Sequence, residues 1–180
     1  MGRIRGKLFI LKCQYLRKNI KIDEGLTIKK KLLITGKGRV SIGKNCVIDG
    51  IKGDASQYVS INTYSRDASI SIGDNAHLCA ARISSRFCIS IGSSVLIEES
   101  GIVDTDFHSI ERDRGRPQDE SLEKCKVVIG DRVAIGSRSF VMKGVHIGDD
   151  AKIFPGSIVT TSVKAGALVL GNPARVLRES

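Results

Sequence analysis

One short segment of this chain holds a side chain that can move a proton. Residues 104–110 read DTDFHSI and contain His108, one of three histidines in the 180-residue sequence. A histidine titrates near neutrality, so one ring nitrogen can take the proton of an attacking hydroxyl and return it to a leaving group. We therefore predict that His108 is a general base. The alternative is that the segment is only the acidic start of a solvated loop.

A polar loop follows this histidine. Residues 111–125 read ERDRGRPQDESLEKC, with Gly115 and Pro117 near the middle. A charged loop of this length that leaves an otherwise compact repeat is more often functional than not. We expect chemistry at the foot of this loop, beside His108.

The elements that must position the loop follow a six-residue repeat. From Lys126 to Val163 an Ile or Val recurs at every sixth position, with a smaller or apolar residue two positions before it. The recurring residues are Ile129, Ile135, Val141, Ile147, Ile153 and Val159. This period fits neither the 3.6-residue period of a helix nor an open-ended alternating strand. It is typical of a parallel β-helix, in which short strands and turns wind into a solenoid.

In an extended segment residues two apart point the same way, so each Ile or Val and the residue two before it should face inward. Gly130, Gly136 and Gly148, with the neighbouring Asp residues, would supply the turns. The pattern continues upstream, less regularly, as far as Leu26. The inward pairs expected there include Leu26/Ile28, Leu32/Ile34, Val40/Ile42, Cys46/Ile48, Val59/Ile61, Ile70/Ile72, Ala76/Leu78, Ile89/Ile91, Val95/Ile97 and Gly101/Val103.

These registered repeats resemble the hexapeptide-repeat acyltransferases, and the resemblance covers most of the chain. It implies an all-β fold, a left-handed parallel β-helix with a short basic N-terminal cap and a loop that protrudes after His108. We place the capping segment at residues 1–25 and the β-helix domain at residues 26–180. Within that domain the loop takes residues 109–125 and a C-terminal cap takes residues 164–180.

DTDFHSI is similar to the segments SDxHSI and TxxHPI of the maltose, galactoside and polysaccharide O-acetyltransferases within that family. The resemblance implies that His108 is the catalytic base, set in a groove between neighbouring subunits of a homotrimer. Asp106 would orient the imidazole or hold a sugar hydroxyl. Asp104 is the weaker candidate for binding the substrate.

The end of the chain, with GSIVTTSV and GNPARVLR, resembles the family's AGSVVTKDV and GNPAKVIR segments. The resemblance implies that acetyl-CoA is the co-substrate. The residues at matching cofactor-binding positions are Ser137, Pro155, Thr160, Thr161, Arg175 and Arg178. The two arginines suit the phosphates of CoA, because a guanidinium group binds such oxyanions in planar, bidentate geometry.

No metal is predicted. His77 and His146 each lie between two inward residues, so they should sit on the outside of the solenoid. The γ-class carbonic anhydrases share this solenoid and bind zinc through three histidines, but such ligands must converge on one ion, and these three are far apart in the sequence. The five cysteines contain no CxxC pair, so neither a zinc site nor a disulfide framework is indicated.

The formal net charge of +10, from 29 Lys and Arg against 19 Asp and Glu, favours anionic partners such as phosphorylated cofactors and acidic glycans. Nucleic acid is not expected, because only 4% of residues are aromatic and no nucleic-acid-binding motif is present. The chain also shows neither a secretory signal nor an apolar run long enough to span a membrane, which predicts a cytoplasmic protein.

The first residues suggest a helix, because Ile4, Leu8, Leu11 and Tyr15 follow helical spacing among basic residues. We expect this helix to cover the open end of the solenoid core, as such folds require. The alternative is peripheral contact between the basic N-terminus and an anionic membrane.

Together these features predict an acetyl-CoA-dependent O-acetyltransferase that acts on a sugar hydroxyl of a saccharide, glycolipid or surface-polysaccharide precursor. An acidic carbohydrate acceptor would suit the net charge. The alternatives are an N-acetyltransferase of an amino-sugar nucleotide, a transferase that takes its acyl group from a carrier protein, and a non-catalytic β-solenoid scaffold. Serine acetyltransferases carry a long helical N-terminal domain, for which this sequence has no room.

Overall fold

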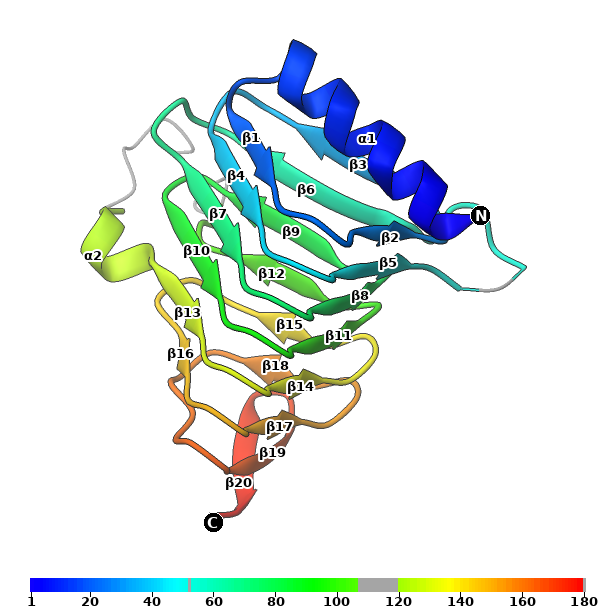
Figure 1. The fold of residues 1–180 in the computed structure, drawn as a ribbon. Helices are drawn as coiled ribbons and strands as arrows, with labels where there is room; N and C mark the ends of the chain where they lie inside the picture. Colours follow the sequence, from blue (N-terminus) through cyan, green and yellow to red (C-terminus); the bar gives the residue numbers. More distant parts are fainter. Residues whose placement is uncertain (52, 107–119, 180) are drawn as a thin grey trace.

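The computed structural model describes residues 1–51, 53–106 and 120–179. Its strands wind into a solenoid whose three sides are the parallel sheets A, B and C (Figure 1). The N-terminus and the C-terminus lie toward opposite ends of the stack of coils (Figure 1). The predicted all-β, left-handed parallel β-helix is thereby confirmed.

Each coil takes one strand from each sheet, and β1 to β18 form six complete coils among the described residues. Sheet A contains β1 (Ile20–Ile22), β4 (Arg39–Ile42), β7 (Ser69–Ile72), β10 (Cys88–Ile91), β13 (Val127–Ile129) and β16 (His146–Ile147). Sheet B contains β2 (Thr27–Ile28), β5 (Val47–Asp49), β8 (His77–Cys79), β11 (Leu96–Glu98), β14 (Ala134–Ile135), β17 (Lys152–Ile153), β19 (Leu168–Gly171) and β20 (Ala174–Arg178). Sheet C contains β3 (Leu32–Thr35), β6 (Val59–Thr63), β9 (Arg82–Ser85), β12 (Gly101–Val103), β15 (Phe140–Val141) and β18 (Ile158–Val159).

The inward residues of the regular repeat are buried as predicted. Ile129, Ile135, Val141, Ile147, Ile153 and Val159 are each at most 3% exposed. Parallel pairing places each of them directly over its equivalent in the next coil, as in Ile129↔Ile147 and Val141↔Val159. The core is therefore one continuous column of Ile and Val, stacked from coil to coil.

The Gly-Asp pairs of the repeat fill the corner between sheets A and B. The carboxylate of Asp149 accepts a hydrogen bond from the backbone N–H of Asp131 at 2.9 Å, and that of Asp131 accepts one from Ser93 at 2.7 Å. The coils approach so closely here that a Cβ on Gly130 would lie 2.8 Å from the backbone N of Asp149. Glycine leaves room for the next coil, and the aspartate caps the exposed N–H groups.

One predicted inward pair, Gly101/Val103, is wrong by one residue. The corner after β11 is one residue shorter than the regular corner, so Ile102, 0% exposed, is the residue that pairs with Ile83 and Val141 inside the core. Gly101 therefore points outward, where the ring of Phe140 lies across it. The same shift turns Asp104 toward the interior.

The expected N-terminal helix is present as α1 (Gly2–Leu16). The helix face that packs against the solenoid differs from the predicted one. Its buried residues are Gly6 and Cys13, with Phe9 and Ile10 packed against the core. The Cα of Gly6 lies so near the backbone carbonyl of Leu26 that a Cβ there would overlap it. The apolar residues on which the prediction rested, including Ile4 at 65% exposed, point to solvent.

The solenoid begins before the expected start at Leu26, because β1 already pairs with β4 through Ile20↔Val40. At the other end, β19 extends sheet B, and β20 turns back antiparallel to it. A short helix, α2 (Leu122–Cys125), leads into β13. None of the helices among the described residues is long and apolar enough to cross a membrane.

Candidate active site

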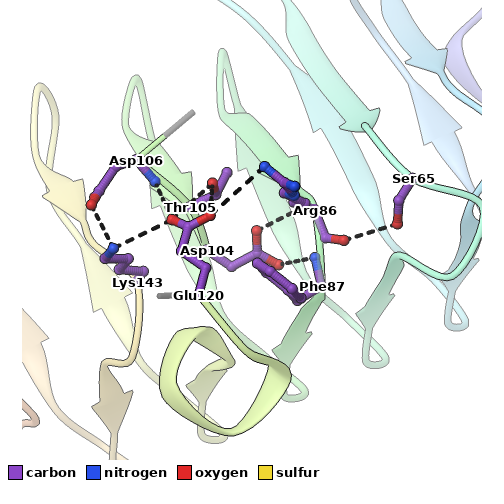
Figure 2. A network of polar contacts seen from close by, with 8 residues as sticks. All are labelled: Ser65, Arg86, Phe87, Asp104, Thr105, Asp106, Glu120 and Lys143. Atoms are coloured by element: carbon purple, nitrogen blue, oxygen red, sulfur yellow. Dashed lines mark hydrogen bonds and ion pairs between the residues drawn. The ribbon is translucent and has the colours of Figure 1, made fainter. Parts of the chain in front are cut away.

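The corner between sheets C and A gathers the polar residues that border the loop. Gly101 pairs with Phe140, and Phe140 pairs with Ile158, so the residues after β12, β15 and β18 leave the stack at the same corner. Asp106 follows β12, and Lys143 follows β15 one coil further along. Figure 2 shows these two side chains pointing toward each other, with an ion pair between them of 2.5 Å.

Glu120 lies at the centre of this network, although it belongs to the far end of the polar loop. Its side chain is only 3% exposed. Its carboxylate accepts hydrogen bonds from the hydroxyl of Thr105 at 3.0 Å, from the backbone N–H of Asp106 at 3.0 Å and from the ammonium of Lys143 at 3.3 Å. An ion pair with Arg86 at 3.9 Å adds a second cation (Figure 2).

The network favours the ionised forms of Glu120 and Lys143. Burial alone would raise the pKa of Glu120, but the hydrogen bonds from Asp106, Thr105 and Lys143 outweigh burial and keep the pKa below its ordinary value. Burial likewise works to lower the pKa of Lys143, yet its bonds to Asp106 and Glu120 raise the pKa overall. Glu120 and Lys143 therefore form a charge-assisted clamp across the corner.

Asp104 lies inside the coil, with an exposed fraction of 0%. Its carboxylate accepts hydrogen bonds from the hydroxyl of Ser85 at 2.6 Å and from the backbone N–H groups of Arg86 and Phe87 at 2.7 and 2.9 Å. A buried carboxylate with three donors stabilises the turn that follows β9. This position supports a structural role for Asp104, because its carboxylate is shielded from solvent and already has three hydrogen-bond donors.

His108 lies outside the described residues, as do all residues from 107 to 119. The residues on either side are described, and Glu120 bonds to both Thr105 and Asp106. The two ends of the loop are thus joined at the corner where the clamp lies. Sequence reasoning named Asp106 but missed Glu120, because nothing in ERDRGRPQDESLEKC separates this acid from its neighbours.

A shallow groove opens beside the clamp. It has a volume of about 340 Å³, and its described lining is Ser65, Asp67, Arg86, Phe87 and Leu122. The guanidinium of Arg86 reaches Glu120, while the backbone carbonyl of the same residue accepts a hydrogen bond from the hydroxyl of Ser65 at 2.9 Å. The groove therefore offers polar side chains next to the point where the loop leaves the solenoid (Figure 2).

The six candidate cofactor-binding residues are spread over the chain. Ser137 and Pro155 lie together at the corner between sheets B and C, where the backbone carbonyl of Ser137 accepts from Gly156 at 2.9 Å. Thr160 and Thr161 follow β18 at the opposite end of sheet C, which is the corner that holds Lys143. One chain therefore does not bring these two groups to one place.

The remaining two candidates, Arg175 and Arg178, lie on β20, which pairs with β19 at the edge of sheet B. Both side chains are exposed. Lys143 and Lys164, two other cations near the C-terminal end of the solenoid, already have anionic neighbours. Lys143 contacts Asp106, and Lys164 pairs with Glu179 at 3.0 Å.

His77 and His146 occupy outward positions, as predicted, on β8 and β16. His77 approaches Asp49 at 3.9 Å. Within the described ranges, no group of three or more His, Cys, Asp or Glu side chains is arranged to hold a metal ion.

The clamp yields a test of its own. Replacing Glu120 by Gln puts an amide N–H₂ where Lys143 and Arg86 need an acceptor, so we expect the free energy of unfolding to fall by about 1–3 kcal/mol. Because the pKa of Glu120 is lowered by folding, its stabilisation is complete above the ordinary carboxyl pKa and is lost as the pH falls through the lower folded value. Denaturant unfolding from pH 7 down to about pH 3 should show the two proteins converging in acid.

Glu24→Gln is the matched control, since Glu24 is an exposed acid with no place in the clamp. It should leave stability nearly unchanged. Equal effects of the two substitutions at pH 7 would contradict the role given to Glu120.

The six-residue repeat of residues 126–161 matches the model of the hexapeptide repeat of succinyl-transferase. Over 54 residues the chain is 43% identical to a 2,3,4,5-tetrahydropyridine-2,6-dicarboxylate N-acetyltransferase of Staphylococcus aureus, a match that covers 30% of this chain and 23% of that protein. The chain thus spans about a quarter of the length of this curated relative.

Two solved structures are similar over nearly the whole chain. AntD, an N-acyltransferase from Bacillus cereus in complex with dTDP and 3-hydroxybutyryl-CoA, is 16% identical, with a TM-score of 0.69 over 97% of this chain and 87% of that one. A hexapeptide-repeat-containing acetyltransferase of Vibrio cholerae is 18% identical, with a TM-score of 0.57 over 97% and 80%. The match to the hexapeptide repeat over residues 126–161 and the likeness to these solved structures together show that the chain has the fold of the left-handed β-helix proteins with hexapeptide repeats.

Proposed function

We propose that this protein transfers an acetyl group from acetyl-CoA to a hydroxyl of a carbohydrate, with His108 as the general base. The observation that carries the proposal is the clamp of Glu120 and Lys143, because both of its residues contact Asp106. Asp106 and Glu120 border the segment that contains His108. A buried, charge-assisted contact between the two ends of one charged loop favours a functional loop over a non-catalytic solenoid scaffold. His108 follows Asp106 by two residues, so we infer that it acts at this corner.

The co-substrate is inferred from the chemistry of the C-terminal residues. Arg175 and Arg178 are exposed guanidinium groups on one strand, suited to the phosphates of CoA. The complex of AntD with 3-hydroxybutyryl-CoA supports an acyl-CoA ligand on a solenoid of the same fold. Pro155 offers no backbone N–H, so hydrogen bonds to the pantetheine amides must come from neighbouring turns.

The active site is completed by a second copy of the chain, and closed symmetry makes a homotrimer. Ser137 and Pro155 lie at one corner of sheet C, whereas Asp106 and Lys143 lie at the other. Between these corners the outward face of sheet C carries Phe140, 47% exposed. Packing this face against a neighbour would bring the cofactor corner of one copy to the loop corner of the next, and three such contacts would close a ring.

The proposed chemistry is direct transfer. His108 removes the proton from the acceptor hydroxyl as its oxygen attacks the carbonyl carbon of the thioester. The tetrahedral intermediate then collapses, the C–S bond breaks, and the imidazolium returns the proton to the departing thiolate. Backbone N–H groups at the turns would stabilise the oxyanion. Asp106, two residues before His108 in the sequence, is held by Lys143, and its proposed role is to orient the imidazole or a sugar hydroxyl.

The groove lined by Ser65, Asp67 and Arg86 is the place proposed for the acceptor. Hydroxyl, carboxylate and guanidinium groups are the hydrogen-bonding set that a sugar ring needs, and the ring of Phe87 supplies an apolar surface for its C–H faces. Arg86 would also favour an acidic carbohydrate.

A second candidate is N-acylation of an amino sugar linked to a nucleotide. AntD is an N-acyltransferase whose structure contains dTDP, a nucleoside diphosphate, and this observation favours the alternative. The two reactions share the cofactor and the base and differ in the acceptor atom. A panel of saccharides and of nucleotide-linked amino sugars, with the new ester or amide identified by its stability to mild alkali, separates them.

The cofactor assignment predicts that CoA binds the purified protein at one site per chain, with salt-sensitive affinity in the micromolar range. Arg175→Ala and Arg178→Ala should each weaken binding about tenfold, since each removes a charge-assisted contact to phosphate. Arg39→Ala, an exposed arginine of β4, should have no effect. Titration calorimetry measures all four proteins, and CoA binding that ignores both C-terminal arginines would contradict the assignment.

The catalytic assignment predicts that His108→Ala lowers kcat by about 10²–10⁴-fold while CoA affinity stays near the native value. The acceptor found in the panel serves as substrate, and thiol release gives the rate. His146→Ala, an exposed histidine of β16, is the control and should keep full activity. A folded His108→Ala protein with nearly native turnover would remove His108 from the mechanism.

A further inference from the structure

Helix α1 has two apolar faces, and only one of them is used by the fold. Gly6 and Cys13 are buried against the first coil. On the other side of the helix, four large apolar side chains point to solvent. They are Ile4, Leu8, Leu11 and Tyr15, which are 65%, 62%, 49% and 83% exposed.

These four residues form a single stripe. Their spacing of four, three and four residues keeps them on one side of a helix, about 180° from Gly6 and Cys13 at 100° per residue. Figure 1 shows α1 lying across the end of the solenoid, with the strands all to one side of it. The stripe therefore faces away from the body of the protein, where a broad surface can reach it. Contiguous exposed apolar side chains of this kind mark interaction sites.

Basic residues flank the stripe on both sides. By helical geometry, Arg3 and Lys7 lie along one edge, and Arg5 and Lys12 lie along the other. Residues 1–18 contain six Lys or Arg and no Asp or Glu. The first turn of α1 contains no acidic residue to offset these charges.

The positive charge on both edges of the stripe indicates which kind of partner binds it. A second copy that used the same helix would bring two clusters of positive charge together, which opposes association. An anionic lipid surface satisfies both features, because apolar side chains enter the boundary between headgroups and acyl chains while Lys and Arg contact the phosphates. We propose that α1 docks the protein onto anionic membranes, lying in the plane of the interface with its stripe of Ile4, Leu8, Leu11 and Tyr15 inserted.

This docking does not depend on the proposed acetyl transfer, and it can be tested without it. The protein is mixed with vesicles of phosphatidylcholine containing about 30% phosphatidylglycerol, or of phosphatidylcholine alone, and bound protein is measured by flotation. We expect binding to the anionic vesicles only. At about 1 M salt, where the Debye length falls to about 3 Å, the bound fraction should drop several-fold.

Two double variants separate the stripe from its flanks. Leu8→Ser with Leu11→Ser removes the inserted side chains, and Lys7→Gln with Lys12→Gln removes one charge from each edge. Each pair should lower the partition coefficient at least about tenfold. All four positions are exposed, so circular dichroism and unfolding should remain native. The controls are Leu177→Ser and Lys152→Gln, an exposed leucine of β20 and an exposed lysine of β17, and both should bind as the native protein does.

Three results would overturn the proposal. The first is no binding to anionic vesicles, and the second is equal binding to vesicles with and without charge. The third is binding that survives both double variants. Sedimentation of the Leu8→Ser, Leu11→Ser protein distinguishes a remaining alternative, because a smaller assembly than the native one would show that the stripe is an interface between copies.

Discussion

The register of hydrogen bonding from coil to coil is the constraint on which the rest of this structure depends. Parallel pairing puts each residue over its equivalent in the next coil, as Ile135 lies over Ile153. Inward side chains therefore form columns of core, and corner residues form columns of turns. Residues distant in sequence, such as Asp106 and Lys143, meet because they leave the stack at the same corner. The β-helix thus positions a site by stacking the corners of successive coils on one another.

Much of the fold could be predicted from the sequence, because a six-residue period states both which residues face inward and where the turns lie. The prediction failed where the period is broken. Because the corner after β11 is one residue shorter than the regular corner, Ile102 faces the core. Asp104, two residues later, faces inward for the same reason. In α1, helical spacing marked an apolar stripe correctly, but periodicity alone does not say which of two faces packs. The close approach of Gly6 to Leu26 decides it, through a tertiary contact.

The candidate site was harder to predict than the fold. Motif resemblance predicted Asp106 and His108, since both lie within one seven-residue segment of the sequence. Glu120 of the clamp and its neighbour Arg86 are 34 positions apart, and only the stacking of coils brings their side chains to 3.9 Å. Similarly, the cofactor candidates form one set in the sequence but occupy both ends of sheet C in space. That separation is the main reason for proposing an active site shared between copies of the chain.

Restoration of activity in mixed assemblies tests the shared site most directly. His108→Ala and the double variant Arg175→Ala, Arg178→Ala are each purified alone, and the two chains are also produced together. If the base of one copy acts on acetyl-CoA held by the next, a random mixture of the two chains in trimers regains about a quarter of native activity, because each mixed trimer contains one intact site. A mixture no more active than either variant alone would contradict the account and place the whole site within one chain.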